Sequence, residues 1–338
     1  MLTADDVPAL SAGATLLGSG GGGAVGLGVT LLHRLLDGAS VPVRPAARLD
    51  RTAGIVHVGV AGAPDVMAER LLDPADLAVA VHAVADRSGV APAAVGIIEI
   101  GGLNALVGVL TAAQLGIPVV DGDLMGRAFP SIRMTSLAVA GHAHTPMAVV
   151  SPAGDVVTIC ASARTAERQM TSAVGAMGGA AAVALHPCTA GVLSDVAVSG
   201  SLSECLRLGW RYLGARAEDP HAVVTALGGR PLLDGRVDEV VPPLGDEPGS
   251  ITVTDLRGGA TARIDHYDEF VAVSRDGVPV ARSPEVIVAL DSRTCAPLRA
   301  DQIRPGHAVT LCSLDALHPW PAGTVDPPAF GLDPEVVR

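Results

Sequence analysis

Residues 99–136 read EIGGLNALVGVLTAAQLGIPVVDGDLMGRAFPSIRMTS, and this stretch places a helical segment between two short apolar runs. The runs at 96–100 and 117–120 are rich in β-branched residues and have the length of strands. Residues 104–115 between them have the composition of a helix. A strand, a helix and a second strand in this order are typical of a parallel α/β sheet, so the stretch predicts an α/β fold.

Polar side chains follow both predicted strands. Glu99 closes the first run and Asn104 follows a glycine turn, while Asp121, Asp123 and Arg127 follow the second run. In open α/β sheets ligands bind at the edge where the parallel strands end. We therefore predict a small-molecule site here, with three catalytic carboxylates (Glu99, Asp121 and Asp123) and with Asn104 and Arg127 binding the substrate.

These residues also have structural alternatives that the sequence leaves open. The carboxylates can act as a general base, accept from ring N–H groups or orient a metal-bound histidine, but Asp123 in particular can simply cap the next helix. Asn104 is also a good turn former. Arg127 either holds a substrate carboxylate with two hydrogen bonds or forms an ion pair with Asp121 or Glu99.

The alternation of strands and helices extends over the first part of the chain, with a further strand expected at 55–60. We expect an N-terminal, mostly parallel sheet with flanking helices over residues 1–165, and a smaller C-terminal domain over 166–338. That domain begins with a helical region and becomes β-rich from about residue 221. Its short apolar runs lie at 250–255, 262–266, 269–275, 286–291 and 308–313.

The composition excludes several classes of protein. The net charge of −12 and the absence of a basic block disfavour nucleic acid and anionic membranes as partners. All 23 basic residues are arginine. Without lysine, the chain forms no Schiff base and has no phosphate-loop lysine, which excludes pyridoxal enzymes, lysine-dependent aldolases and ordinary P-loop NTPases.

Composition also indicates in which compartment the protein is expected and whether it is expected to form an oligomer. No apolar run approaches the roughly 20 residues that span a bilayer, and no basic segment precedes an N-terminal apolar stretch, so we expect neither a membrane segment nor a signal peptide. Five widely spaced cysteines suit a reducing cytoplasm. The 49% hydrophobic content favours a homo-oligomer.

A run of glycines at 18–23, interrupted only by Ser19, formally satisfies the dinucleotide-binding pattern G-x-G-x-x-G. That pattern needs a strand before it, whereas a helical segment precedes this one, so dinucleotide binding is disfavoured. The run is either a turn with close backbone approach or a site for an anion or substrate carbonyl at the next helix. In the second case Gly21 and Gly22 contact the substrate.

Histidine and cysteine side chains suggest a metal centre. His142, His144, His186 and Cys188 offer three imidazoles and a thiolate, which are zinc ligands, and His57 is held in reserve as a further ligand. Zinc or another divalent metal would lower the pKa of a bound water toward 7. Alternatively, the Cys188 thiolate is a nucleophile, or these side chains are ordinary core and surface residues.

Several motifs occur together in a fixed order: LGSGGGG at 17–23, HVGVAGAP at 57–64, EIGGLN at 99–104, VVDGDLMGRAFP at 119–130 and AMGGAAAVALHP at 176–187. In this combination the chain resembles the S-methyl thiohydantoin desulfurase family. The resemblance is dense up to about residue 213 and looser beyond it.

The resemblance implies hydrolysis of an S-methyl thiohydantoin to the hydantoin with release of methanethiol. Water adds to ring carbon C2 and the thiolate leaves, which calls for an activated water, stabilisation of the adduct and a proton donor for sulfur. The chain departs from the family pattern at His57, His142, His144, His186 and Cys188. These departures point either to a metal-dependent subfamily, with zinc activating the water, or to a different substrate.

Two other functions remain open. One is a hydantoinase-like hydrolase that opens a cyclic amide at a C–N bond, or a subunit of such an enzyme. The other is a non-catalytic subunit that binds a small heterocyclic molecule. The release of methanethiol, measured against ring opening of a hydantoin, separates the desulfurase from the hydantoinase-like hydrolase.

Overall fold

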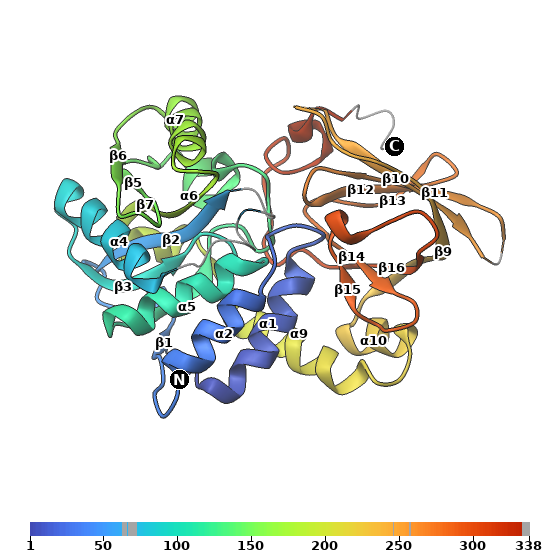
Figure 1. Cartoon of the computed structure of the whole chain (residues 1–338), viewed down its shortest axis with the longest axis horizontal. Coiled ribbons are helices and arrows are strands. Elements are labelled where there is room, and N and C mark those ends of the chain that lie inside the picture. Colours follow the sequence, from blue (N-terminus) through green and yellow to red (C-terminus); the bar gives the residue numbers. More distant parts are fainter. Residues whose placement is uncertain (63–65, 67–72, 246, 257, 333–338) are drawn as a thin grey trace.

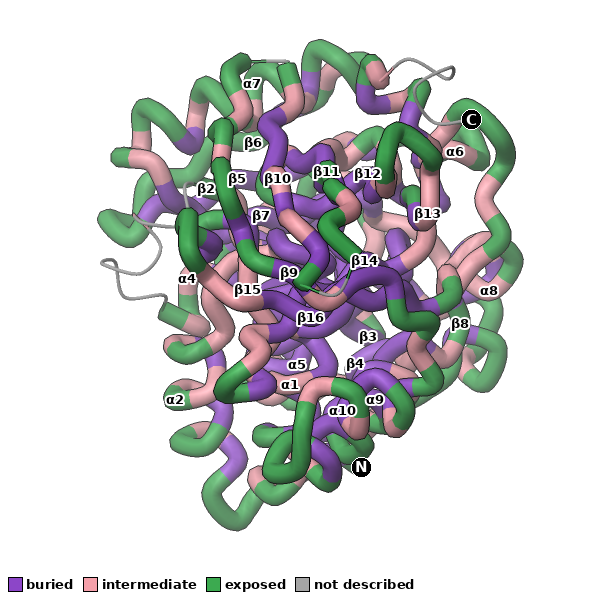
Figure 2. The backbone as a smooth tube through the Cα atoms, turned by 90° about the vertical axis from the view of Figure 1, so that its right-hand side faces the viewer, coloured by how far each residue is buried: buried purple, intermediate pink, exposed green. Residues whose placement is uncertain are grey.

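A computed structural model describes residues 1–62, 66, 73–245, 247–256 and 258–332 of the chain, which fold into two lobes (Figure 1). The first lobe is a mixed sheet with flanking helices, and the second is an antiparallel sheet. Figure 2 shows that the buried segments run through the centre of both lobes. The expected fold class, an α/β lobe followed by a β-rich lobe, is confirmed.

The strands of the first lobe are β1 (Val43–Arg44), β2 (Gly54–Gly62), β3 (Pro92–Ile97), β4 (Val119–Asp123), β5 (Met147–Val150), β6 (Val156–Ile159), β7 (Ala180–Thr189) and β8 (Val198–Ser199). Its helices are α1 (Val7–Leu17), α2 (Gly26–Leu35), α4 (Pro74–Ser88), α5 (Leu103–Leu115), α6 (Ser136–Val139), α7 (Ala163–Ala176), α8 (Ala190–Val196) and α9 (Ser201–Ala215), with short 3₁₀ turns η1 (Ala4–Asp6), η2 (Ala46–Arg48) and η3 (Ile132–Met134). Helix α10 (Pro220–Leu227) leads into the second lobe.

The first sheet has the strand order β1-β4-β3-β2-β7-β5-β6, and β8 pairs with β4. Neighbours from β1 to β2 are parallel, while β7 is antiparallel to both β2 and β5. Strand β7 comes from the apolar run 180–185, whose small residues fit a helix or a strand equally well. The first lobe therefore extends past residue 165, since β7 lies in the middle of its sheet.

Local sequence signals set the ends of the helices that precede β3 and β4. Helix α4 begins after Asp73, whose side chain accepts a hydrogen bond from the Ala75 backbone N–H. Helices α4 and α5 both end at a glycine with positive φ, Gly89 at 72° and Gly116 at 66°. These stops return the chain to strands β3 and β4, and so fix where the polar residues after those strands lie.

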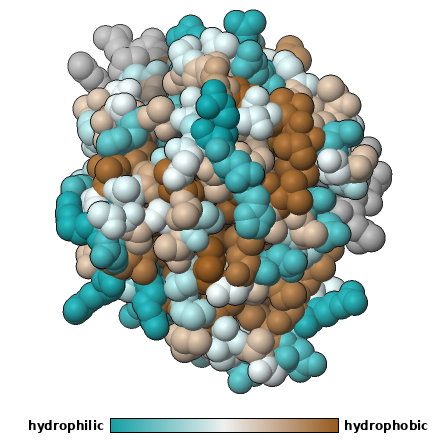
Figure 3. Space-filling model, turned by 90° about the vertical axis from the view of Figure 1, so that its left-hand side faces the viewer, coloured by the Kyte–Doolittle hydropathy of each residue, from teal (hydrophilic) through white to brown (hydrophobic). Residues whose placement is uncertain are grey.

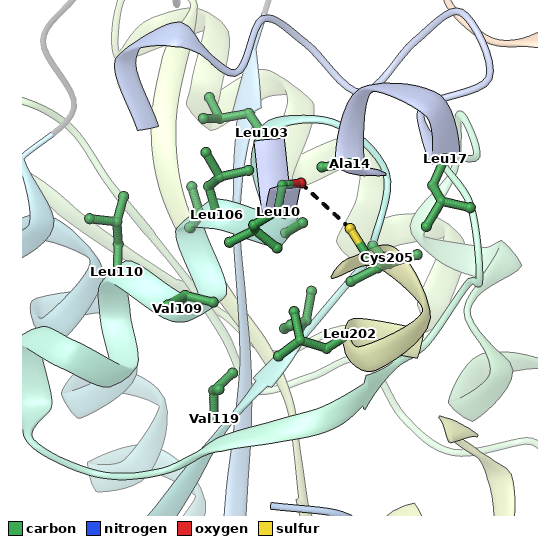
Figure 4. Close-up of a cluster of buried hydrophobic side chains, with 14 of the residues drawn as sticks. Leu10, Ala14, Leu17, Leu103, Leu106, Val109, Leu110, Val119, Leu202 and Cys205 are labelled. Atoms are coloured by element: carbon green, nitrogen blue, oxygen red, sulfur yellow. Dashed lines mark hydrogen bonds between the residues drawn. The ribbon is translucent and has the colours of Figure 1, made fainter. Parts of the chain in front are cut away.

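Helices α1, α5 and α9 meet in the main apolar core, part of which Figure 4 shows. Glycines allow α1 and α9 to approach closely. A Cβ on Gly13 would lie 1.9 Å from the Cys205 carbonyl oxygen, and one on Gly209 would lie 1.8 Å from the Ala9 carbonyl oxygen. The Cys205 thiol lies 3.6 Å from the Leu10 carbonyl oxygen at this crossing. Cys205 is therefore a core residue.

The second lobe is a sheet with the order β13-β12-β11-β10-β9-β16-β14-β15 and antiparallel pairing throughout. Its strands are β9 (Arg230–Val241), β10 (Gly249–Asp255), β11 (Thr261–His266), β12 (Phe270–Arg275), β13 (Val278–Arg282), β14 (Val286–Asp291), β15 (Pro297–Leu298) and β16 (Ala308–Leu314), and its 3₁₀ turns are η4 (Ala300–Gln302) and η5 (Pro327–Phe330). All five apolar runs expected to form strands in this part do so.

The loop between α1 and α2 joins the two lobes. The Ser19 hydroxyl donates to the Ile287 carbonyl at 2.9 Å and accepts from the Ile287 backbone N–H at 3.0 Å. The Phe270 N–H donates to the Ser19 carbonyl and the Ala300 N–H to the Gly20 carbonyl. This glycine-rich loop thus forms part of the interface between the lobes.

The surface of the first lobe carries hydrophobic residues in patches between hydrophilic ones (Figure 3). Among the described residues, no helix is long and apolar enough to cross a membrane. The homo-oligomer and the cytoplasmic location expected from the sequence stay predictions.

Candidate active site

A buried carboxyl group lies in the loop after β3. The Glu99 side chain accepts a 2.6 Å hydrogen bond on Oε1 from the side-chain amide of Asn104, in the first turn of α5. The amide oxygen of Asn104 in turn accepts from the backbone N–H of Val60 in β2 at 2.7 Å. Glu99 is 8% exposed and Asn104 is 9% exposed. The amide therefore fixes the carboxyl group between a strand and a helix.

Glu99 and Asn104 line a small pocket of about 110 Å³. Its other walls are mainly apolar and come from β2, β7, η3 and α7 and from the loops after β3 and β4: Val60, Ala61, Ile98, Met125, Phe129, Pro130, Ser131, Ile132, Met170, Val183 and Leu185. A mainly apolar pocket with a few convergent polar groups is the usual form of a small-molecule site.

The surroundings of Glu99 favour its protonated form. Burial, together with the nearby charge of Glu269, raises the pKa of the Glu99 carboxyl to about 8, although hydrogen bonds from Asn104 and from the Phe129 backbone oppose the shift. A carboxyl group with a pKa near neutrality is suited to general acid–base chemistry.

The second carboxyl group, Glu269, comes from the other lobe. It precedes β12, is buried, and its Oε2 has no hydrogen-bond partner among the described residues. Burial and the neighbouring Asp268 raise the pKa of Glu269 to about 7, against the opposing effect of Arg127 and of backbone N–H groups that include Gly22. Two buried carboxyl groups therefore interact across the lobe interface.

Sequence reasoning missed Glu269, although 269–275 was expected to form a strand. Catalytic carboxylates were expected at the ends of parallel strands, whereas Glu269 lies at the start of an antiparallel strand in the other lobe. The adjacent pair Asp268 and Glu269 before an apolar run was the available signal.

Arg127 lies beside both carboxyl groups but is occupied by the backbone. It is 2% exposed, and its guanidinium donates to the carbonyl oxygens of Ala128 (3.1 Å), Glu285 (2.6 Å) and Phe270 (2.7 Å). Burial lowers the pKa of Arg127 to about 10, and the charges of Glu269 and Glu99 act against that shift. Arg127 does not line the pocket, so this geometry gives it an electrostatic and structural role rather than contact with a substrate carboxylate.

The other two predicted carboxylates have structural partners. Asp123 is buried, and its Oδ2 accepts from the backbone N–H groups of Ile100, Met125 and Gly126 at 2.8–2.9 Å. Burial raises the pKa of Asp123 to about 6. Asp121 accepts from the Ser203 backbone N–H at 2.9 Å and from the Ser203 hydroxyl at 2.7 Å, which caps α9. Of the three predicted catalytic carboxylates, Glu99 alone lines the pocket.

The two glycines predicted to bind substrate lie against protein instead. A Cβ on Gly21 would be 2.3 Å from Oε1 of Glu269, and one on Gly22 would be 2.9 Å from the Gly101 backbone. The Gly22 carbonyl accepts from the Leu103 N–H at 2.7 Å, at the start of α5. Of the two roles left open for this loop, the structure shows the close backbone approach.

The predicted metal ligands come together only in part, with the rings of His57 and His144 beside that of His186. His142 is exposed, while His144 and His186 are buried with their ring centroids 4.7 Å apart. His144 Nε2 lies 3.1 Å from the Ile132 carbonyl, and His186 Nδ1 lies 3.0 Å from the Ala143 carbonyl. Among the described residues, no three histidine, cysteine or acidic side chains are grouped so as to hold a metal ion. In this arrangement they do not fit the predicted zinc site.

The reserve ligand His57 and the alternative nucleophile Cys188 also lie outside the pocket lining. His57 Nδ1 lies 2.9 Å from the His186 carbonyl, and burial lowers the pKa of His57 to about 4. Cys188 packs beside a cluster of apolar residues, and burial raises the pKa of its thiol to about 12. A protonated thiol is a poor nucleophile, so this environment does not favour covalent chemistry at Cys188.

The fold and the site define a two-lobed α/β protein with one buried carboxyl group in a pocket of the first lobe and a second, Glu269, on the second lobe. The family description "S-Me-THD-like, N-terminal domain" matches residues 5–161, and "S-Me-THD-like, C-terminal domain" matches residues 161–338. The chain belongs to this family, and the resemblance seen in the sequence is confirmed.

One solved structure has the same fold over nearly its whole length. It is an X-ray crystal structure of a protein from Chromobacterium violaceum, with a TM-score of 0.77 and 23% identity over 93% of this chain and 92% of that chain. At this identity the likeness shows the fold alone. No curated protein matches the chain.

Proposed function

We propose that this protein is a hydrolase that converts an S-methyl thiohydantoin to the hydantoin and methanethiol, with Glu99 as its acid–base group. Family membership supports the substrate class. The observation that carries the proposal is the position of Glu99, a buried carboxyl group with a raised pKa in the wall of a mainly apolar pocket. Such a group can both accept and donate a proton near neutral pH.

The reaction starts from the ionised form of Glu99. The carboxylate accepts a proton from water as the water oxygen forms a bond to C2, and Glu99 then passes this proton to the ring nitrogen of the former C2=N bond. The adduct loses its hydroxyl proton to the Glu99 carboxylate as the C2–S bond breaks, and Glu99 gives that proton to the sulfur, which leaves with the electron pair of the broken bond. One proton of the water ends on nitrogen and the other on sulfur, so atoms and charge balance.

The neighbours of Glu99 have distinct parts in this scheme. Asn104 holds Oε1, and its second amide N–H can donate to a ring carbonyl in the pocket. Glu269 raises the pKa of Glu99, and the buried Arg127 limits the charge that the two carboxylates build up. Apolar residues around the pocket exclude bulk water and strengthen these interactions.

The test is the substitution Glu99→Gln, which keeps the shape and an acceptor for Asn104 but removes the acid–base group. We expect kcat/KM for methanethiol release from an S-methyl thiohydantoin to fall by roughly 100-fold or more. Asp121→Asn is the matched control, because it also neutralises a carboxylate of the first lobe, but one that caps α9. We expect its kcat/KM to stay within about twofold, while helix stability falls by about 1 kcal/mol.

The alternatives give different results in the same assay. Ring opening of a hydantoin, without thiol release, would make the protein a C–N hydrolase that uses the same carboxyl group. Binding of hydantoins without turnover of either substrate would make it a small-molecule-binding subunit. Unchanged thiol release in Glu99→Gln would refute the role of Glu99.

A further inference from the structure

Strand β6 is an outer strand of the first sheet. Among the described residues it pairs with β5 alone, in a regular antiparallel register that sets Met147 opposite Ile159 and Val150 opposite Val156. In an antiparallel pair, every second residue of the outer strand directs its N–H and C=O away from the partner strand. Figure 1 shows β6 on the side of the first lobe that faces away from the second lobe. The outer edge of β6 can therefore pair with another chain.

The other outer strands of the two sheets carry features that protect a free edge. Strands β1, β8 and β15 are each two residues long. Strand β13 contains Pro279 and Arg282, and its pairing with β12 has an irregular register. Short strands, proline, charged side chains and bulges all discourage pairing between edges. Strand β6, in contrast, is four residues long, is regularly paired and reads Val-Val-Thr-Ile, four β-branched residues that favour a strand.

Side chains of β6 are exposed on both faces of the sheet. Val156 lies opposite Val150, which belongs to the core that includes α4, and Val157 lies opposite Val149, which belongs to the core that includes α7. Residues directly opposite each other share a face of the sheet. Val156 and Val157 are nevertheless 45% and 40% exposed, and Thr158 is exposed as well. The helices that cover the middle of the sheet therefore leave β6 uncovered, and a partner would bury apolar surface on both faces.

The charge of this segment favours a second copy of the chain as the partner. Residues 156–163 read VVTICASA and contain no charged side chain, in a chain with 35 acidic and 23 basic residues. Two copies that each carry a net charge of −12 repel each other, and they repel least where they meet through uncharged surface. A strand edge is also complementary to itself when two antiparallel copies meet about a twofold axis. A partner recognised through its charge would instead require charged side chains on this segment.

We propose that β6 pairs antiparallel with β6 of a second copy of this chain, so that the first sheets of the two copies join into one. With Thr158 on the twofold axis, Val156 lies opposite Cys160 of the partner subunit, and no charge enters the seam. With Val157 on the axis, the charged Asp155 would instead lie opposite Ile159 of the partner subunit.

The helices beside β6 add to this interface. A stable interface buries about 800 Å² on each partner, which is more than a four-residue strand supplies. Helices α4 and α7 contact β6, belong to the cores on opposite faces of the sheet, and so flank the seam. No residue of β6 lines the pocket beside Glu99, so this inference does not rest on the proposed function.

Sedimentation velocity over a series of chain concentrations tests the proposal. We expect the native protein to sediment as a dimer at micromolar concentrations. Val157→Lys places a positive charge beside the twofold axis in each copy, and like charges that meet across an interface weaken it. We therefore expect the dissociation constant of the dimer to rise by roughly 100-fold or more. The far-UV circular dichroism of the variant should be unchanged, because Val157 is exposed in the single chain.

The matched control is Val278→Lys, which makes the same change at an exposed valine on the outer strand of the other sheet. We expect it to keep the dissociation constant of the native dimer. A native protein that stays monomeric at every concentration would overturn the proposal. A dimer that survives in Val157→Lys, or one that is lost in Val278→Lys, would also overturn it, because the interface would then lie elsewhere.

A cross-linking measurement decides the question even if Val157→Lys fails to fold. Thr158→Cys is made together with Cys160→Ser, which removes the exposed thiol next to β6. Two copies of a residue that face each other across the axis have Cβ atoms about 5 Å apart, close to disulfide distance. We expect a disulfide-linked dimer under mild oxidation, and none from Val278→Cys in the same background. Absence of the cross-link in Thr158→Cys would refute the pairing of β6 with its copy.

Discussion

The side-chain amide of Asn104 donates to the Glu99 carboxyl group at 2.6 Å while its oxygen accepts from the Val60 backbone. Asn104 is the single asparagine of the chain. Its amide group both fixes the orientation of the carboxyl group and lowers its pKa against the effect of burial. Reactivity and local stability therefore depend on the same side chain.

Asn104→Ala is expected to raise the pKa of Glu99 above about 8, because a hydrogen bond that favours the carboxylate is lost. If the carboxylate starts the reaction, the rise of kcat/KM with pH moves to higher pH, and activity at pH 7 falls. The variant also leaves the Val60 N–H without its partner, which costs about 1–3 kcal/mol of stability. A pH–rate profile and a urea titration measure the two effects. A profile that stays in place would separate Asn104 from the pKa of Glu99.

Glu269→Gln is expected to act in the opposite direction. It removes a negative charge that raises the pKa of Glu99, so the carboxylate form becomes available at lower pH. The pH profile of kcat/KM should then shift to lower pH by up to about one unit. Opposite shifts in Asn104→Ala and Glu269→Gln would support coupling across the lobes. A shift of both variants in one direction would contradict it.

Gly21→Ala is expected to disturb the site without touching the pocket wall. The new Cβ would lie 2.3 Å from Oε1 of Glu269, so the loop or the carboxylate must move. We expect a stability loss of about 1–3 kcal/mol and a changed pH profile. Gly26→Ala, at the start of α2, is the control, because a Cβ there has nothing within 4 Å. Equal thermal stability of the two variants would show that the loop has room for a side chain.

Acid stability should depend on His57. Its pKa is lowered from the usual 6.5 to about 4 by burial, so between these values the unfolded chain binds a proton that the folded chain does not. The free energy of unfolding therefore falls as the pH drops from 6.5 to 4, by up to about 1.4 kcal/mol per pH unit for this group. His57→Asn should reduce that slope in urea titrations. His142→Asn, at an exposed position, should keep it; identical slopes in both variants would assign the acid sensitivity elsewhere.

The strands and helices that follow simple patterns were predictable from the sequence. The run 55–60 lies in β2 and the run 117–120 overlaps β4, because apolar β-branched residues between glycine and proline mark a buried strand. Strand β3 ends at Ile97, so Glu99 lies in the following loop rather than in the strand. That small difference frees its side chain to turn into the pocket.

The contacts that complete the site were not predictable, for two physical reasons. Glu269 reaches Glu99 through the packing of two lobes, and no spacing along the chain encodes that approach. His142 and His144 are two positions apart, a spacing that places both side chains on one face only within a strand, but they precede β5 in a loop, where this alternation does not hold. One of them is exposed and the other is buried.

The position of β7 limits how this protein can be divided. The family's N-terminal segment ends at residue 161, yet β7, from the C-terminal segment, hydrogen-bonds to β2 and β5 in the middle of the first sheet. A gene fragment cut at that boundary would leave two strand edges open, and exposed edges promote aggregation. Recombinant halves should therefore precipitate when expressed separately and dissolve only when the two are co-expressed.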